Sequence, residues 1–274
     1  MPSQQILFQS EHHPLVAEQF ETLEQYCLSL LHLKAYETAA AMARGKRVLD
    51  LGCNNGYGSE LLAREAAQVT GVDVSERSIA AARRRCPRLE FLLVDGVTLP
   101  FPDASFDAVF SFQVIEHIDD PAPYLAEIRR VLRPDGVAVL TTPNGEVRLE
   151  PGMAPWNEFH VREYSTRELS ALLGRTFGSV EILGLTAIAE LARVEERRVR
   201  RARLMARTTR RGGLAGRVLG PLRAVRRGLL AALSRSALVR HRREQAFRRF
   251  GTADLHYEKD NGSAALDLMA ICRP

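Results

Sequence analysis

Long apolar runs are missing from this chain: nowhere in its 274 residues do eighteen apolar residues follow one another. A helix needs about 20 such residues to cross a bilayer, so no transmembrane span is expected. The opening residues, Met1-Pro2-Ser3-Gln4-Gln5, also lack the basic region and the apolar stretch of a signal peptide. These absences predict a cytoplasmic protein.

Cysteine is scarce, and its spacing excludes two kinds of protein. The four cysteines, Cys27, Cys53, Cys86 and Cys272, show none of the paired spacings of a zinc site or of a compact disulfide framework. They are expected to be buried free thiols. A hydrophobic content of 46% and a charged content of 26% exclude a chain that is disordered throughout. The length allows one α/β domain with an insertion or a small second lobe.

Lysine is absent from residues 190–250, although this segment holds half of the chain's 38 basic residues. Its 19 arginines and four acids give it a net charge of +15, whereas the rest of the chain carries −10 of the total of +5. From Leu214 onward apolar residues recur at helical spacing, which predicts short basic amphipathic helices. An anionic membrane, an acidic substrate, nucleic acid and packing within a helical lobe all remain open as partners.

Short apolar runs alternate with helical stretches from residue 47 onward. Strands are expected at 47–51, 68–72, 89–94, 106–112, 137–142, 180–185 and 266–272, and helices at 59–67, 78–85, 121–132 and 166–177. This alternation predicts an α/β fold with a doubly wound, mostly parallel, seven-stranded sheet. The expected organisation is a helical segment at 1–45, a core at 46–189, an arginine-rich helical insertion at 190–250 and a final strand of the core within 251–274.

A glycine-rich turn follows the first expected strand, at Gly52-Cys53-Asn54-Asn55-Gly56-Tyr57-Gly58. Glycine lets backbone approach a ligand closely. Three acids end strands or precede the turn: Asp50, Asp73 and Asp95. Ligands of open α/β sheets bind at the carboxyl ends of strands, and an acid after the second strand can accept hydrogen bonds from both ribose hydroxyls. The sequence therefore predicts a nucleoside site, although the Gly-x-Gly-x-x-Gly fingerprint of dinucleotide oxidoreductases is not met.

The order of these motifs resembles the class I S-adenosylmethionine-dependent methyltransferases. The resemblance covers about residues 46 to 184 and rests on the segments 48–58, 71–73, 95–96 and 99–107. Within the superfamily, the chain looks most like methyltransferases of glycan and natural-product gene clusters and of ubiquinone biosynthesis. The resemblance implies a Rossmann-like methyltransferase fold and S-adenosylmethionine as the cofactor.

By position, the resemblance implies the following cofactor site: Asp50 and Gly52 near the methionine moiety, Asp73 on the ribose hydroxyls, Asp95 and Gly96 near the adenine, Cys53, Asn54, Gly56 and Val74 around them, and Gln113 facing the sulfonium and the substrate. One position departs from the family pattern, because Asn54 stands where glycine is usual. Asparagine tolerates a left-handed backbone better than other non-glycine residues, so the turn is still expected to form.

The acceptor side is expected around Glu116, His117 and His160. Methyl transfer from a sulfonium is an in-line displacement, so the protein must align the nucleophile and, for a hydroxyl acceptor, remove its proton. His117 follows the fourth strand, and imidazole titrates in the range that suits a base near neutral pH. The plainer alternatives are that Glu116 and His117 only start a helix and that His160 only bonds loop backbone.

A divalent metal is a second interpretation of the same residues. In similar ubiquinone-pathway and small-RNA methyltransferases, an acid three residues before a Glu-His pair, with a later histidine in the second group, holds a metal that activates the hydroxyl. Gln113 stands here in place of the first acid, and an amide is a weaker ligand for a hard cation. Metal-dependent and metal-free transfer both remain open.

Three functions are consistent with these residues. The first is O-methylation of a sugar, glycan precursor or other small hydroxylated metabolite, at the inner membrane surface if residues 190–250 bind lipid. The second is methylation of nucleic acid, with the arginines on phosphates. The third is a methyltransferase fold that binds a partner or a membrane without catalysis.

Overall fold

A computed structural model describes residues 20, 22–210, 245, 247–259, 261 and 264–274, so the amphipathic helices expected from Leu214 onward lie outside the described residues. In chain order the elements are α1 (Leu23–Ala43), β1 (Arg47–Leu51), α2 (Tyr57–Leu62), β2 (Gln68–Asp73), α3 (Glu76–Arg85), β3 (Glu90–Leu93), β4 (Phe106–Phe112), η2 (Ile115–His117), α4 (Pro121–Val131), β5 (Leu132–Pro143), α5 (Gly145–Arg148), α6 (Thr166–Leu173), β6 (Ser179–Ala187), α7 (Ala189–Arg210), η3 (Thr252–Asp254), β7 (Leu255–Lys259) and β8 (Asp267–Arg273). Two compact units result: residues 31–186 with 255–274, and the described residues of 20–30 with 187–254.

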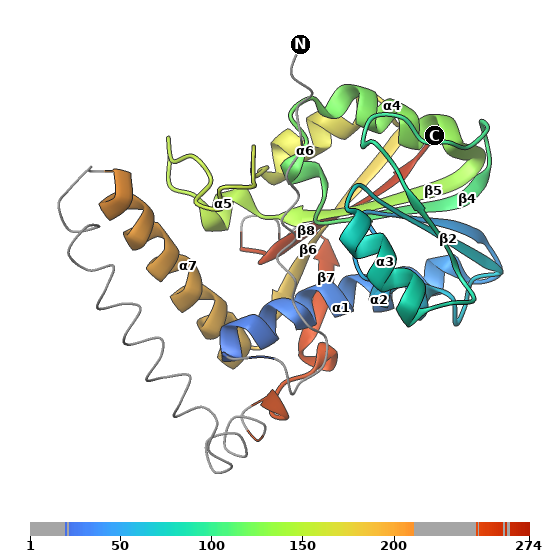
Figure 1. Cartoon of the computed structure of the whole chain (residues 1–274). Helices are drawn as coiled ribbons and strands as arrows, with labels where there is room; N and C mark the ends of the chain where they lie inside the picture. Colours follow the sequence, from blue (N-terminus) through green and yellow to red (C-terminus); the bar gives the residue numbers. More distant parts are fainter. Residues whose placement is uncertain (1–19, 21, 211–244, 246, 260, 262–263) are drawn as a thin grey trace. The chain divides into compact units, whose positions relative to one another are not determined.

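The strands of the first unit form one mixed sheet in the order β3-β2-β1-β4-β5-β8-β6-β7 (Figure 1). Neighbours from β3 to β5 run parallel, whereas β8 runs antiparallel to both β5 and β6. The expected doubly wound, mostly parallel fold is confirmed. The sheet has eight strands rather than seven, because Leu255–Lys259 forms an additional strand at its edge. That strand holds two charged residues and a histidine in five positions, so its sequence gives no apolar run.

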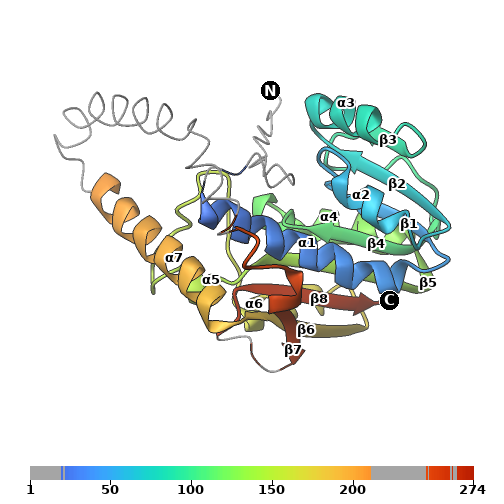
Figure 2. The same cartoon turned by 90° about the horizontal axis from the view of Figure 1, so that it is seen from below.

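Alternate side chains of the strands enter two hydrophobic layers, as the period of a strand requires. On one face, Leu49 and Val109 pack in a cluster with α4 and α6. On the other face, Val48 and Phe110 pack with α1 and α2. Figures 1 and 2 show these helices on opposite sides of the sheet. Helices of the described part of the chain therefore cover both faces, which leaves the strand ends accessible to a ligand.

The strand order reverses between β1 and β4. From β1 the chain moves outward to β2 and β3, then returns to β4 on the other side of β1. Open α/β sheets bind ligands outside the carboxyl ends of the strands at such a reversal. The turn after β1 and the residues after β2, β3 and β4 all lie at this edge, which is where the sequence places the cofactor.

The second unit has an aromatic cluster and paired charges of its own. The rings of Tyr26 and Phe247 stack with centroids 4.9 Å apart, and Phe20 meets both rings edge to face. The buried Glu195 on α7 pairs with Arg198 one turn later. None of the described helices is long and apolar enough to cross a bilayer.

Candidate active site

The turn after β1 is held against the end of β2. The backbone N–H groups of Gly52 and Cys53 both donate to the carbonyl oxygen of Val72, at 2.8 and 3.0 Å. Gly52 has a φ of 83°, and a Cβ there would lie 2.5 Å from Cγ2 of Val114, so glycine is required. Asn54 has a φ of 49°, the left-handed region expected of an asparagine in this turn. The turn thus forms without a glycine at that position.

Cys53 and Gly56, two further members of the predicted cofactor site, pack the turn against the rest of the domain. Cys53 is fully buried. Gly56 precedes α2 with a φ of 79°, and a Cβ on it would come within 3.0 Å of both Ala82 and Phe91. The turn is therefore packed closely on α3 and β3, and its shape is fixed by backbone and small side chains.

Asp73, the acid that ends β2, accepts hydrogen bonds from backbone N–H groups of the turn after β1 and of the residue before α3. Oδ2 of Asp73 accepts from the N–H of Asn54 at 2.9 Å, and Oδ1 accepts from the N–H of Ser75 at 2.8 Å. A carboxylate offers about four lone-pair sites, so it can accept more than one hydrogen bond on each oxygen. Asp73 is partly exposed, as a ribose ligand must be.

Asp95, Gly96 and Val74 meet at the neighbouring strand end. Oδ1 of Asp95 accepts from the N–H groups of Val97 and Thr98 at 2.8 and 2.9 Å. These bonds lower the pKa of Asp95, so the exposed carboxylate is ionised near neutral pH. Gly96 has a φ of 81°, and a Cβ on it would lie 3.1 Å from Cγ1 of Val74. The three residues assigned to the adenine region are thus brought together.

Asp50 lies beneath the turn, fully buried. Its Oδ1 accepts from the hydroxyl of Tyr36 at 3.1 Å and its Oδ2 from the hydroxyl of Ser59 at 2.5 Å. Burial raises the pKa of Asp50 to about 6, against the two hydrogen bonds, which lower it. The carboxylate therefore ties β1 to α1 and α2, and its contact with the methionine moiety stays a prediction.

Gln113 follows β4 in a left-handed conformation, with a φ of 57°. Non-glycine residues in this region cost about 1 to 3 kcal/mol and cluster at functional sites. The side-chain Nε2 of Gln113 donates to Oδ2 of Asp267 at 3.1 Å. The amide is thus directed to β8, so its expected approach to the sulfonium remains a prediction.

The structure brings Glu116, His117 and His160 together from η2 and from the long loop after α5. Their ligand atoms all lie within 4.8 Å of one another, and the two imidazole centroids are 4.8 Å apart. Glu116 is fully buried; its Oε2 accepts from Thr142 at 3.1 Å, and its Oε1 has no partner among the described residues. Burial raises the pKa of Glu116 to about 8.

Both imidazoles are oriented through Nδ1. The Nδ1 of His117 lies 2.8 Å from the carbonyl oxygen of Phe159, which can only accept, so this nitrogen bears the proton. The Nδ1 of His160 lies 2.8 Å from Oε1 of Glu163. Burial favours a raised pKa for Glu163, but its bonds to His160 and Arg148 outweigh burial and keep that pKa below its ordinary value. In its neutral form each ring therefore offers the Nε2 lone pair.

A buried ion pair supports His160. The guanidinium of Arg148 donates to both oxygens of Glu163, at 2.9 and 3.0 Å, with side-chain exposures of 9% and 0%. The ring of Trp156 lies against Arg148, 4.5 Å from its guanidinium carbon. Sequence reasoning missed this pair, because no spacing rule relates residues 15 positions apart across a loop. The one available signal was an acid three residues after His160.

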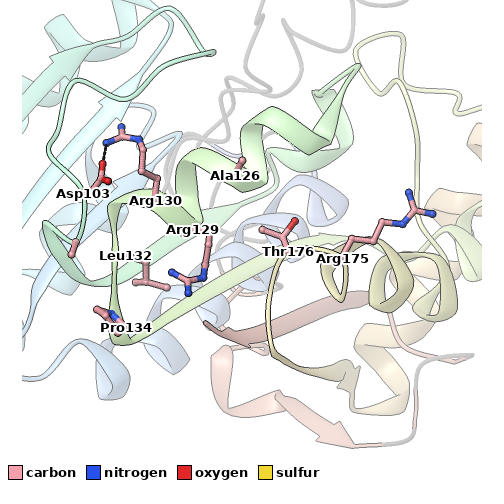
Figure 3. Close-up of a pocket in the computed structure, with 9 residues that line it drawn as sticks. Asp103, Ala126, Arg129, Arg130, Leu132, Pro134, Arg175 and Thr176 are labelled. Carbon is pink, nitrogen blue, oxygen red and sulfur yellow. Dashed lines mark hydrogen bonds and ion pairs between the residues drawn. The ribbon is translucent and has the colours of Figure 1, made fainter.

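A shallow hollow lies at the opposite edge of the sheet (Figure 3). Its volume is about 660 Å³, and it is lined by Arg129 and Arg130 from α4, by Leu132 at the start of β5, and by Arg175 and Thr176 after α6. Strand β5 begins here, whereas the cofactor edge is where that strand ends. The hollow contains none of the residues expected to bind the cofactor.

Residues 49–140 match the family described as a methyltransferase domain. The chain contains a methyltransferase domain. The resemblance to class I S-adenosylmethionine-dependent methyltransferases is thereby confirmed, and the matched residues include most of β1, the turn after it, β2 to β4 and most of β5. Its family implies S-adenosylmethionine as the cofactor.

Relatives of known sequence extend the similarity beyond the methyltransferase domain. A probable S-adenosylmethionine-dependent methyltransferase of Mycolicibacterium smegmatis is 42% identical over 168 residues, which are 61% of this chain and 65% of the relative. A fatty-acid O-methyltransferase of the same species is 39% identical over 125 residues, 44% of each chain. The matches thus span less than two thirds of either relative's length.

One solved structure is similar over nearly the whole chain. An S-adenosylmethionine-dependent methyltransferase from Thermotoga maritima has a TM-score of 0.57 and covers 90% of this chain and 90% of its own. Its identity is 16%, so the likeness concerns the fold. It confirms the Rossmann-like methyltransferase architecture that the motifs imply.

Proposed function

We propose that the methyltransferase domain binds S-adenosylmethionine at the carboxyl ends of β1 to β4 and transfers its methyl group to a hydroxyl oxygen. The acceptor class is a sugar, a glycan precursor or another small hydroxylated metabolite, including a lipid-linked one. The observation that supports this proposal most is the convergence of Glu116, His117 and His160 beside the end of β4, where their ligand atoms lie within 4.8 Å of one another.

Two histidine nitrogens at this place suit the removal of a hydroxyl proton. In the transfer, the acceptor oxygen forms a bond to the methyl carbon while the carbon–sulfur bond breaks, and the hydroxyl proton passes to an Nε2. The pKa of Glu116, raised to about 8 by burial, leaves that carboxyl mostly protonated near pH 7. Without a cation, Glu116 therefore acts as a hydrogen-bond donor, and His117 or His160 acts as the base.

Hydroxyl and carboxylate acceptors differ in whether their methylation requires a base. A relative at 39% identity is named a fatty-acid O-methyltransferase, which supports an oxygen as the methylated atom. A carboxylate is already deprotonated at neutral pH, so its methylation requires no base. The two histidines favour a hydroxyl over a carboxylate as the acceptor of this chain.

A divalent cation fits the same three residues, and it is part of the proposal. The buried Oε1 of Glu116 has no partner among the described residues, and both imidazoles are oriented by a contact at Nδ1. One carboxylate with two imidazoles suits manganese, iron or zinc more than magnesium. When bound, such an ion lowers the pKa of a coordinated hydroxyl.

The experiment is an acceptor screen by mass spectrometry with isotopically labelled S-adenosylmethionine, run with manganese and with a chelator. We expect label on hydroxylated acceptors, and we expect His117→Ala and His160→Ala to lose turnover while donor affinity is kept. His256→Ala, an exposed histidine on β7, is the matched control and should retain full turnover. Full turnover in both active-site variants, or label only on carboxylates or nitrogens, would overturn the proposal.

A further inference from the structure

The ion pair between Arg148 and Glu163 lies behind His160, on the side away from Nε2. We propose that Glu163 is a positioning residue for His160 and that Arg148 holds Glu163 in place. This inference deepens the proposed function and rests on it. An isolated carboxylate with no exposure is strongly destabilising unless it is paired and hydrogen-bonded. The two-pronged contact from Arg148 meets this condition, at 2.9 and 3.0 Å.

The arrangement fixes which nitrogen of His160 is available. Oε1 of Glu163 accepts from Nδ1 at 2.8 Å, so the proton of neutral His160 stays on Nδ1 and the lone pair on Nε2. Carboxylate partners of this kind affect activity or metal affinity by roughly 10- to 100-fold. Both a proton acceptor and a metal ligand need that tautomer.

Close packing between α5 and the following loop keeps Arg148 and Glu163 next to each other. Gly145 begins α5 so close to the loop that a Cβ on it would lie 2.7 Å from the carbonyl oxygen of Glu163. Its N–H donates to the carbonyl oxygen of Tyr164 at 2.8 Å. Trp156 covers the guanidinium of Arg148 at 4.5 Å. A backbone hydrogen bond and a buried ion pair thus attach the loop that bears His160 to α5.

Glu163→Gln tests the proposal, since it keeps the shape and removes the charge. In nitrogen NMR without donor or acceptor, we expect neutral His160 to keep its proton on Nδ1 in the original chain and to populate both neutral tautomers in Glu163→Gln. In the enzyme assay we expect kcat to fall about 10- to 100-fold, with donor affinity unchanged. Glu158→Gln, an exposed acid of the same loop, is the control.

The two readouts separate this proposal from the proposed function. A changed His160 tautomer with no methyl transfer to any acceptor supports the positioning role and counts against the hydroxyl transfer. An unchanged tautomer overturns the positioning role, whatever the turnover. If Glu163→Gln does not fold, Arg148→Lys keeps the charge but loses the two-pronged contact, and it should also populate the second tautomer of His160, to a smaller extent.

An independent observation concerns α7 in the second unit. Arg193, Arg197 and Arg200 are exposed along one line of the helix, and Leu204 continues the line at 62% exposure. Leu191 and Val199 on the other side are buried. From this face we infer a docking surface for an anionic lipid bilayer, since arginines interleaved with an exposed leucine at helical spacing are typical of interfacial helices.

The sequence around this face favours lipid over nucleic acid. After Glu196 the helix contains no acid, and residues 190–246 contain no phenylalanine, tyrosine or tryptophan. Base stacking on aromatic rings supplies much of the affinity for single-stranded nucleic acid, so its absence disfavours that partner. Arginine binds lipid phosphate equally well without aromatic neighbours.

Co-sedimentation with vesicles tests the docking surface. We expect the chain to bind phosphatidylcholine vesicles only when phosphatidylglycerol is added. Arg197→Gln with Arg200→Gln should weaken this binding about 30-fold, since each basic residue at an anionic surface contributes about 1 kcal/mol. Leu204→Ser should also weaken it, and Arg64→Gln with Arg84→Gln, two exposed arginines of the first unit, should not. Equal binding to neutral vesicles, or an RNA gel shift without vesicle binding, would overturn the inference.

Discussion

The backbone N–H of Asn54 donates to Oδ2 of Asp73 at 2.9 Å, so the acid that ends β2 is bonded directly to the turn that follows β1. Its other oxygen accepts from Ser75, at the start of the next helix. The residue expected to bind the ribose therefore also holds the backbone of the turn in place. A substitution at Asp73 is therefore expected to affect both ribose binding and the backbone of the turn.

The first prediction concerns Asp73→Asn. The amide keeps the volume but loses the charge and one acceptor oxygen, and a hydrogen bond to a charged group is worth about 1.5 to 3 kcal/mol. We expect affinity for S-adenosylmethionine, measured by calorimetry, to fall roughly 10- to 100-fold. Asp135→Asn, at a position 83% exposed, is the control with the same chemistry. Equal affinity in the two variants would contradict the role of Asp73.

The second prediction compares two glycines that both have positive φ. Gly52 has a φ of 83° and meets Val114 at 2.5 Å from an added Cβ, whereas Gly45 has a φ of 69° and meets nothing within 4 Å. Gly45→Ala should cost only the left-handed backbone, about 1 kcal/mol. Gly52→Ala should cost that and a further 1 to 3 kcal/mol or so for overpacking. Urea denaturation checks the order, and Val114→Ala should recover part of the loss in Gly52→Ala.

Much of the fold and of the cofactor site is visible in the sequence because it depends on local rules. Gly52, Asp73 and Asp95 each stand at or just after the carboxyl end of a strand, and a parallel sheet brings such positions to one edge. The acceptor side depends on contacts that no local rule determines. His117 and His160 were candidates by residue type, but their meeting needs the loop after α5, and Glu163 gained a role only from where Arg148 lies. Strand β7 was missed because an edge strand with polar residues has no apolar period.

The third prediction is a pH dependence that arises from Asp50. Burial raises its pKa from 3.8 to about 6, so between these values the folded chain binds more protons at this group than the unfolded chain does. The contribution of Asp50 to the free energy of unfolding therefore falls as pH rises from about 4 to 6, by at most about 1.4 kcal/mol per unit. Asp50→Asn removes this dependence. Denaturation without S-adenosylmethionine at several pH values should show the variant gaining stability relative to the original chain over that interval, and parallel curves would contradict the assignment.

The fourth prediction concerns a cation at Glu116, His117 and His160, whose ligand atoms lie within 4.8 Å of one another. Manganese is the suitable probe, because its paramagnetic signal in solution disappears when the ion binds. We expect one bound ion per chain, with tighter binding at pH 8 than at pH 6, because the carboxyl and both imidazoles must lose their protons to bind it. Glu116→Gln and His160→Ala should each abolish this binding, and Glu158→Gln, an exposed acid near His160, should retain it. If Glu116→Gln binds manganese as the original chain does, the buried Oε1 is not a ligand and the histidines act as a base without a metal.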